Sequence, residues 1–169
     1  MKIFEKYLPL KSLAFFPTLI GQSVNQIYSN TIIGDFDNNY FEAGSISVPL
    51  NMGFVCFRTI WTNDSEYEYN LLEVTKRDEP IGHDLFSITP SSKIKTIELY
   101  SEKLVQEWNI HGTELTTVKY DSAFLFRQDD GSSFLIGISE MSDVLVLFLR
   151  NEKEINDFLV GLDKRLEWQ

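Results

Sequence analysis

Two histidines, one cysteine and one serine are the residues of this chain best suited to act as catalytic bases or nucleophiles. His83 lies in Ile-Gly-His-Asp-Leu and His111 in Asn-Ile-His-Gly, both typical of loops. Cys56 stands in an apolar, strand-like run, where a thiol usually behaves as a small hydrophobic group. Ser139 lacks the second glycine of a nucleophile elbow. Because catalysis needs a nucleophile, a base and an orienting group that converge, we predict no catalytic residue.

Asp35, Asp37 and Asn39 have the spacing of the first three ligands of a calcium-binding loop. Such a loop has glycine at its sixth position and a bidentate glutamate at its twelfth. Tyr40 and Ile46 occupy those positions here, so a solvated turn is the better interpretation. A single cysteine also excludes a disulfide framework and thiolate zinc ligation. We therefore expect neither a metal nor another cofactor.

The strongest chemical signal is a set of acidic residues that lie close to tyrosines. Acidic patches speed association with basic partners, and buried tyrosines often anchor protein interfaces. A solvated face without a partner is the alternative, since charge runs are usually solvated. The candidate contact residues are Asp35, Asp37, Asp64, Glu66, Tyr67, Glu68, Tyr69, Asp78 and Glu79, with Glu42 close to the first group.

The overall charge agrees with a basic partner. The chain of 169 residues has 25 Asp and Glu against 15 Lys and Arg, a formal net charge of −10 at pH 7. Nucleic-acid phosphates are bound by clustered Lys and Arg, so no direct nucleic-acid partner is expected.

The apolar content indicates a folded protein. Hydrophobic residues make up 43% of the chain, enough for the core of one domain over residues 1–169. No apolar run approaches the roughly 20 residues of a membrane span. Glu5 and Pro17 interrupt the N-terminal segment that most resembles a signal peptide. With its one cysteine, the chain is expected to be cytoplasmic.

Most of the chain predicts short strands separated by turns. Two nearly all-apolar runs, 54–61 and 144–149, predict strands buried on both faces. Gly131 in Gln-Asp-Asp-Gly predicts a hairpin turn. The other expected strands cover 23–28, 40–48, 66–74, 94–100, 122–127 and 133–139, and residues 75–90 are expected to be mostly loop.

The hydrophobic period changes near the C-terminus and predicts a helix. Asn151 is followed three residues later by Glu154, which resembles a capping box. Apolar residues then recur at helical spacing. The expected fold is α+β, an antiparallel-rich sheet of about seven or eight strands with a C-terminal amphipathic helix packed on one face. The residues of the apolar stripe are Ile155, Phe158, Leu159, Leu162 and Leu166.

The second half of the chain resembles small acidic immunity proteins of bacterial polymorphic toxin systems, including contact-dependent inhibition systems. The resemblance rests on the order of 93–100, 120–126, the Asp-Asp-Gly turn at 129–131, 134–138 and the capped helix from 151. It implies a protein without enzymatic activity that binds a co-encoded toxin domain in the cytoplasm and blocks its active site or its access to substrate. Each immunity protein is matched to its own toxin, so the resemblance assigns no binding residue.

Two other functions remain open from the sequence. One is a small hydrolase-like enzyme that uses His83 or His111 with neighbouring acids. The other is a structural adaptor with a different partner.

Overall fold

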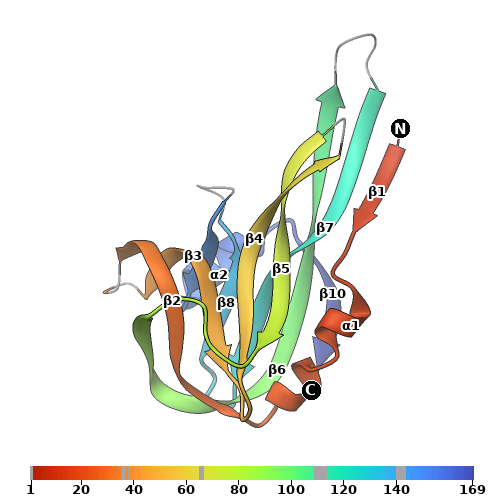
Figure 1. The fold of residues 1–169 in the computed structure, drawn as a ribbon. Coiled ribbons are helices and arrows are strands. Elements are labelled where there is room, and N and C mark those ends of the chain that lie inside the picture. Colours follow the sequence, from red (N-terminus) through yellow and green to blue (C-terminus); the bar gives the residue numbers. More distant parts are fainter. Residues whose placement is uncertain (1, 36, 38, 65–66, 109–113, 140–143) are drawn as a thin grey trace.

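Strands dominate the fold, as the many short apolar runs predict. The computed structural model describes residues 2–35, 37, 39–64, 67–108, 114–139 and 144–169. Within this part, ten strands join in one sheet, antiparallel except for the pairing of β1 with β7 (Figure 1). The strands are β1 (Lys2–Lys6), β2 (Ser23–Asp35), β3 (Tyr40–Pro49), β4 (Phe54–Asp64), β5 (Tyr67–Arg77), β6 (Asp84–Trp108), β7 (Glu114–Gln128), β8 (Ser133–Ile138), β9 (Val146–Leu149) and β10 (Asp163–Trp168); the helices are α1 (Leu10–Leu13), the 3-10 helix η1 (Phe16–Leu19) and α2 (Glu152–Phe158).

Six of the strands close into a ring. The order β7–β8–β9–β3–β2–β6 returns to its start because β6 also pairs with β7. The length of β6 makes this closure possible, since residues 84–93 pair with β2 and residues 94–108 with β7. β1 and β10 add to the outer parts of β7 and β6, and the β4–β5 hairpin adds to β3. Pairing on both sides leaves the ring strands few unsatisfied backbone groups.

Phenylalanine fills the core of the ring. The rings of Phe126 and Phe134 stack with their centroids 4.6 Å apart, and those of Phe41 and Phe148 stack at 4.9 Å. Burial of each ring contributes roughly 1.5–3 kcal/mol of hydrophobic stabilisation. The fully buried phenylalanines are Phe16, Phe41, Phe57, Phe124, Phe126, Phe134 and Phe148.

The N-terminal helices belong to the same core. α1 and η1 bring Leu13, Phe16 and Leu19 into the main hydrophobic cluster. The ring of Phe16 stacks on Phe124 at 4.6 Å and on Trp168 at 5.1 Å. The first turns of the chain and its last strand are therefore held together through one aromatic side chain.

A buried ion pair joins three distant parts of the chain. The carboxylate of Asp121 on β7 accepts hydrogen bonds from Arg165 on β10 at 2.7 and 2.6 Å, and from the backbone N–H of Leu8 at 2.7 Å. Asp121 is 2% exposed, and the guanidinium of Arg165 also lies 4.7 Å from the ring centre of Tyr7. A carboxylate buried this deeply needs such partners, because burial of an unpaired charge is very costly.

The helix at the C-terminal end is shorter than expected and is not the last element. Asn151 caps it as predicted, its Oδ1 accepting from the N–H groups of Lys153 and Glu154. The helix ends at Phe158, and the chain turns at Gly161, whose φ is 84°. The residues that follow form strand β10 on β6, so the predicted stripe divides between helix and strand. No helix of the described residues is long and apolar enough to cross a membrane.

The expected strands all occur, but the predicted number of seven or eight is too low, because β1 and β10 bring the sheet of the described residues to ten strands. The predicted burial of residues 54–61 is only half right. Val55, Cys56 and Phe57 are buried, whereas Arg58 and Trp61 are exposed. The reason is that β3 pairs only with the first part of β4, and the rest of β4 pairs with β5 alone.

The loop predicted for residues 75–90 is wrong at both ends. β5 continues to Arg77, and β6 begins at Asp84. Phe86 and Ile88 face the core while Leu85 is exposed, which is the alternation of a strand. This alternation comes directly after a stretch of proline, glycine and charged residues that is typical of a loop. Residues 78–83 form the crossover between β5 and β6, and Ile81 exchanges hydrogen bonds there with the Ser47 hydroxyl of β3.

Replacing Arg165 with methionine is expected to lower the free energy of unfolding by about 3–5 kcal/mol, because Asp121 then stays buried without its charged partner. Equilibrium unfolding in urea measures this loss. The matched control is Lys103→Met, which removes the exposed pair of Lys103 with Asp163, with side chains 56% and 68% exposed, and should cost less than about 1 kcal/mol. Equal losses in the two variants would contradict the structural role of the buried pair.

Candidate functional site

The acidic residues predicted to bind a partner lie on three separate parts of the sheet. Asp35 and Asp37 lie at the turn between β2 and β3, and Asp78 and Glu79 lie in the crossover that leads to β6. The third group lies at the β4–β5 hairpin, where Asp64 is the register partner of Tyr67. Figure 1 shows the end of β2 and the end of β4 on different sides of the molecule. The structure therefore does not gather the predicted residues into one cluster.

The β4–β5 group is described only through its backbone. Tyr67, Glu68 and Tyr69 begin strand β5, and Asp64 ends β4. Glu66 lies outside the described residues, as does His111. The predicted contacts of this hairpin therefore remain predictions.

The other two groups are open to solvent. Asp35, Asp37, Asp78 and Glu79 are all exposed. None of the ion pairs between described residues involves Asp37, Asp78 or Glu79. Their negative charge is thus available to an approaching partner.

A cavity of about 300 Å³ lies next to the first of these groups, between strands β3 and β9 and helix α2. Asp35 is the register partner of Tyr40, and Tyr40 is in turn the partner of Leu149 on β9. The cavity therefore opens beside the β2–β3 turn. We call it the acidic pocket; its lining residues are Tyr40, Glu42, Leu147, Leu149, Glu154, Asp157 and Phe158.

The alternation of the strands explains why these side chains meet. Phe41 on β3 and Phe148 on β9 pack in the core of the ring, so their neighbours on the same strands face outward, toward α2. On the helix, Glu154 and Asp157 are three residues apart and share one face. Helix and sheet approach closely at Gly137, where an added Cβ would lie 3.1 Å from the Phe158 ring.

Glu42 is the most deeply buried charged group of the pocket. It is 2% exposed, and its Oε1 accepts from the Tyr40 hydroxyl at 2.5 Å and from the Ser139 hydroxyl at 2.7 Å. Its Oε2 is buried and has no hydrogen-bond partner, and the same is true of Oε2 of Glu154 within the described part of the chain. Buried polar atoms are nearly always paired in folded proteins, so these two oxygens are unusual.

The chemistry of Tyr40 reflects the negative charge around it. Burial raises the pKa of the Tyr40 hydroxyl, and the hydrogen bond to Glu42 and the charges of Glu42 and Glu154 raise it further. Tyr40 thus stays a neutral hydrogen-bond donor, and its proton is committed to Glu42. The pocket presents carboxylate acceptors beside apolar walls, an arrangement that favours a cationic group with an apolar stem.

Sequence reasoning reached only part of this pocket. Glu42 was expected in the acidic group at 35–42, but on the surface rather than buried. Glu154 was interpreted as part of a capping box, and no role was predicted for Asp157. The sequence signal that could have indicated the pocket is the spacing of three residues between Glu154 and Asp157, followed directly by Phe158. Only the tertiary packing of α2 on β3 brings them to Glu42.

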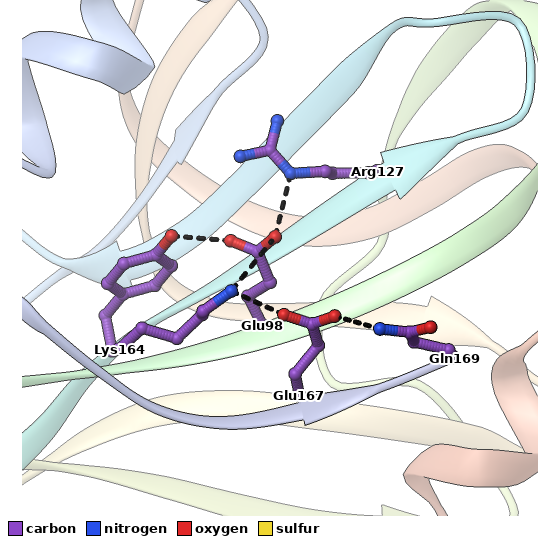
Figure 2. A network of polar contacts seen from close by, with 6 residues as sticks. Glu98, Arg127, Lys164, Glu167 and Gln169 are labelled. Atoms are coloured by element: carbon purple, nitrogen blue, oxygen red, sulfur yellow. Dashed lines mark hydrogen bonds and ion pairs between the residues drawn. The ribbon is translucent and has the colours of Figure 1, made fainter.

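A second cluster of titratable residues surrounds Glu98 on β6. Its carboxylate accepts from Arg127 on β7 at 2.9 Å and from the Tyr100 hydroxyl at 2.5 Å, and lies 4.0 Å from Lys164 on β10. Figure 2 shows Glu98 at the centre, with Lys164 leading on to Glu167. Because every one of these charges has a partner within the fold, the cluster serves to join three strands.

The pKa values of this cluster follow from its pairing. Burial of Glu98 favours its protonated form, but hydrogen bonds from Arg127 and Tyr100 and the nearby positive charges hold its pKa below the ordinary 4.5. Burial and the hydrogen bond to Glu98 raise the pKa of Tyr100 to about 12.

Two of the residues considered for catalysis, Cys56 and Ser139, are buried and hydrogen-bonded within the fold. Cys56 is 1% exposed and accepts a hydrogen bond from the Ser47 hydroxyl. Ser139 is 2% exposed and donates to Glu42. His83 is exposed in the crossover. Across the described ranges, no three His, Cys, Asp or Glu residues are arranged to hold a metal ion.

Comparison of the chain with protein-family models, with curated proteins and with solved structures returns no match. The fold and the acidic pocket are therefore interpreted from their own chemistry.

Replacing Glu98 with glutamine is expected to remove part of the acid sensitivity of the protein. The pKa of Glu98 is lower in the folded state than in the unfolded state, so its stabilising effect is complete above about pH 4.5 and is lost as the pH falls through the folded-state pKa. Urea unfolding of both proteins between about pH 3 and 6 measures this. The stability difference between wild type and Glu98→Gln should shrink in acid, and a constant difference would contradict the assignment.

Proposed function

We propose that this chain is a non-catalytic binding protein that neutralises a basic bacterial toxin domain in the cytoplasm, as immunity proteins do. The observation that supports this most is the distribution of its negative charge. Buried Glu98 and Asp121 are neutralised by arginines within the fold. Exposed Asp37, Asp78 and Glu79 are outside the ion pairs of the described residues. An uncompensated acidic surface attracts and orients a basic partner.

The action proposed is occlusion. A toxin that cleaves nucleic acid needs a basic cleft for its substrate, and that cleft is the natural docking surface for an acidic protein. One-to-one binding there excludes the substrate without any chemistry by the inhibitor. The gene beside this one and co-purification from the native host identify the partner: a large secreted-toxin reading frame supports the proposal, and a metabolic operon counts against it.

The double charge reversal Glu66→Lys with Glu68→Lys is expected to slow association with that partner by about tenfold or more at low salt, because it removes steering attraction. It should also weaken the dependence of the association rate on ionic strength. Stopped-flow fluorescence or surface plasmon resonance at several salt concentrations measures both effects.

The matched control is Glu5→Lys with Asp163→Lys. It changes the net charge by the same amount, but on β1 and β10, where both acids pair with lysines. The control is expected to slow association much less. Unchanged kinetics in the Glu66 and Glu68 variant would overturn the assignment of the β4–β5 hairpin as a contact surface.

Replacing both His83 and His111 with alanine separates binding from the hydrolase alternative. Protection of cells against the toxin is expected to survive the double substitution, because binding does not require a general base. Loss of protection, with folding intact by circular dichroism, would favour the enzyme instead.

A further inference from the structure

We propose that the acidic pocket between β3, β9 and α2 is a binding site for a guanidinium group on an apolar stem, such as an arginine side chain. This goes beyond the proposed function, because it concerns the pocket alone and stands whether or not the partner is a toxin. The ligand is either a free small molecule or an arginine of a protein partner, and the experiments below distinguish these sources.

Two glutamates of the pocket each have a buried oxygen without a hydrogen-bond partner among the described residues. Oε2 of Glu42 and Oε2 of Glu154 are both buried, and neither has a hydrogen-bond partner in the described part of the chain. Glu42 is 2% exposed, and its other oxygen is already held by Tyr40 and Ser139. The side chain is therefore fixed in place with one free acceptor, and the residue lines the pocket. A donor group bound in the pocket would satisfy such an acceptor.

The side chains that line the pocket make it negatively charged. Three carboxylates line the pocket, from Glu42, Glu154 and Asp157, and no basic side chain is among the lining residues of the described chain. Arg150 and Lys153 are the basic residues next to these in sequence, but neither lines the pocket. Among the side chains that line the pocket in the described chain, the neutral donor is the hydroxyl of Tyr40. It already donates its hydrogen bond to Glu42. The site therefore selects against anions and favours a cation.

The apolar wall of the pocket favours an organic cation over a metal ion. Leu147, Leu149 and Phe158 line the same cavity, and the described carboxylates are not arranged so that three of them could hold a metal ion. An arginine buries its methylene stem along apolar surface while its planar head donates several hydrogen bonds at once. Two carboxylates that each offer a free oxygen suit that forked head. A volume of about 300 Å³ accommodates one such side chain.

The direct test uses butylguanidinium as the probe and butylurea as its neutral analogue of the same shape. Isothermal titration calorimetry and ¹⁵N NMR titration of the full chain are expected to show saturable binding of butylguanidinium and none of butylurea. Glu154→Gln and Glu42→Gln should each weaken binding by about tenfold or more, because each removes one charged acceptor.

Glu152→Gln is the matched control, since it makes the same change on the same helix at an exposed residue that does not line the pocket. It should change the affinity less than twofold. Thermal unfolding checks that the variants fold. If Glu42→Gln does not fold, Glu154→Gln alone tests the proposal. No saturable binding of butylguanidinium, equal binding of butylurea, or equal weakening by Glu152→Gln would overturn the proposal.

The source of the guanidinium follows from the same variants and the purified partner. If an arginine of the partner fills the pocket, Glu154→Gln lowers the affinity of the complex about tenfold and Glu152→Gln does not. If a small molecule fills it, the partner binds both variants equally while butylguanidinium binding still depends on Glu154. If butylguanidinium binds and the partner search finds no toxin, the pocket proposal stands and only the proposed function is refuted.

Discussion

Closure of the sheet is the constraint on which the rest of this structure depends. β6 is long enough to pair with β2 over its first part and with β7 over its second, and this joins the two ends of a six-strand ring. The inside of the ring is then filled by phenylalanines. With the interior packed by these side chains, the outside of the ring, where α2 and the β5–β6 crossover pack against the strands, offers the surface for a site. The acidic pocket is such an outside site.

Local sequence patterns predict the elements well because local forces determine them. Alternation and turn residues identify the strands, and Asn151 caps α2 as its position suggests. Closure was not predictable, because it depends on pairings between segments far apart in the chain, such as β3 with β9 and β2 with β6. The helix was predicted too long because Leu162 and Leu166 continue the helical spacing by coincidence. The turn at Gly161 and the pairing of β10 with β6 override that spacing.

The same distinction between local and distant effects explains what was missed at the site. Glu42 lies in an acidic stretch and reads as a surface residue, yet α2, more than a hundred residues later, covers it. Whether an acid is exposed, paired or buried without a partner is a property of tertiary packing. The acids of this chain, whose net charge is −10, therefore include at least three kinds: acids paired inside the fold, acids exposed on the β2–β3 turn and the crossover, and the carboxylates of the pocket.

We infer that the buried carboxylates of the pocket bind a cation from outside the fold. Carbon-13 NMR of the side-chain carboxyl groups, followed while butylguanidinium is added, tests this most directly. We expect the carbon-13 chemical shifts of the Glu42 and Glu154 carboxyl groups to change together, saturably and with one dissociation constant. The chemical shift of the exposed Glu152 carboxyl group should not change. Carboxyl signals of Glu42 and Glu154 that stay fixed, or that move only as much as that of Glu152, would contradict it.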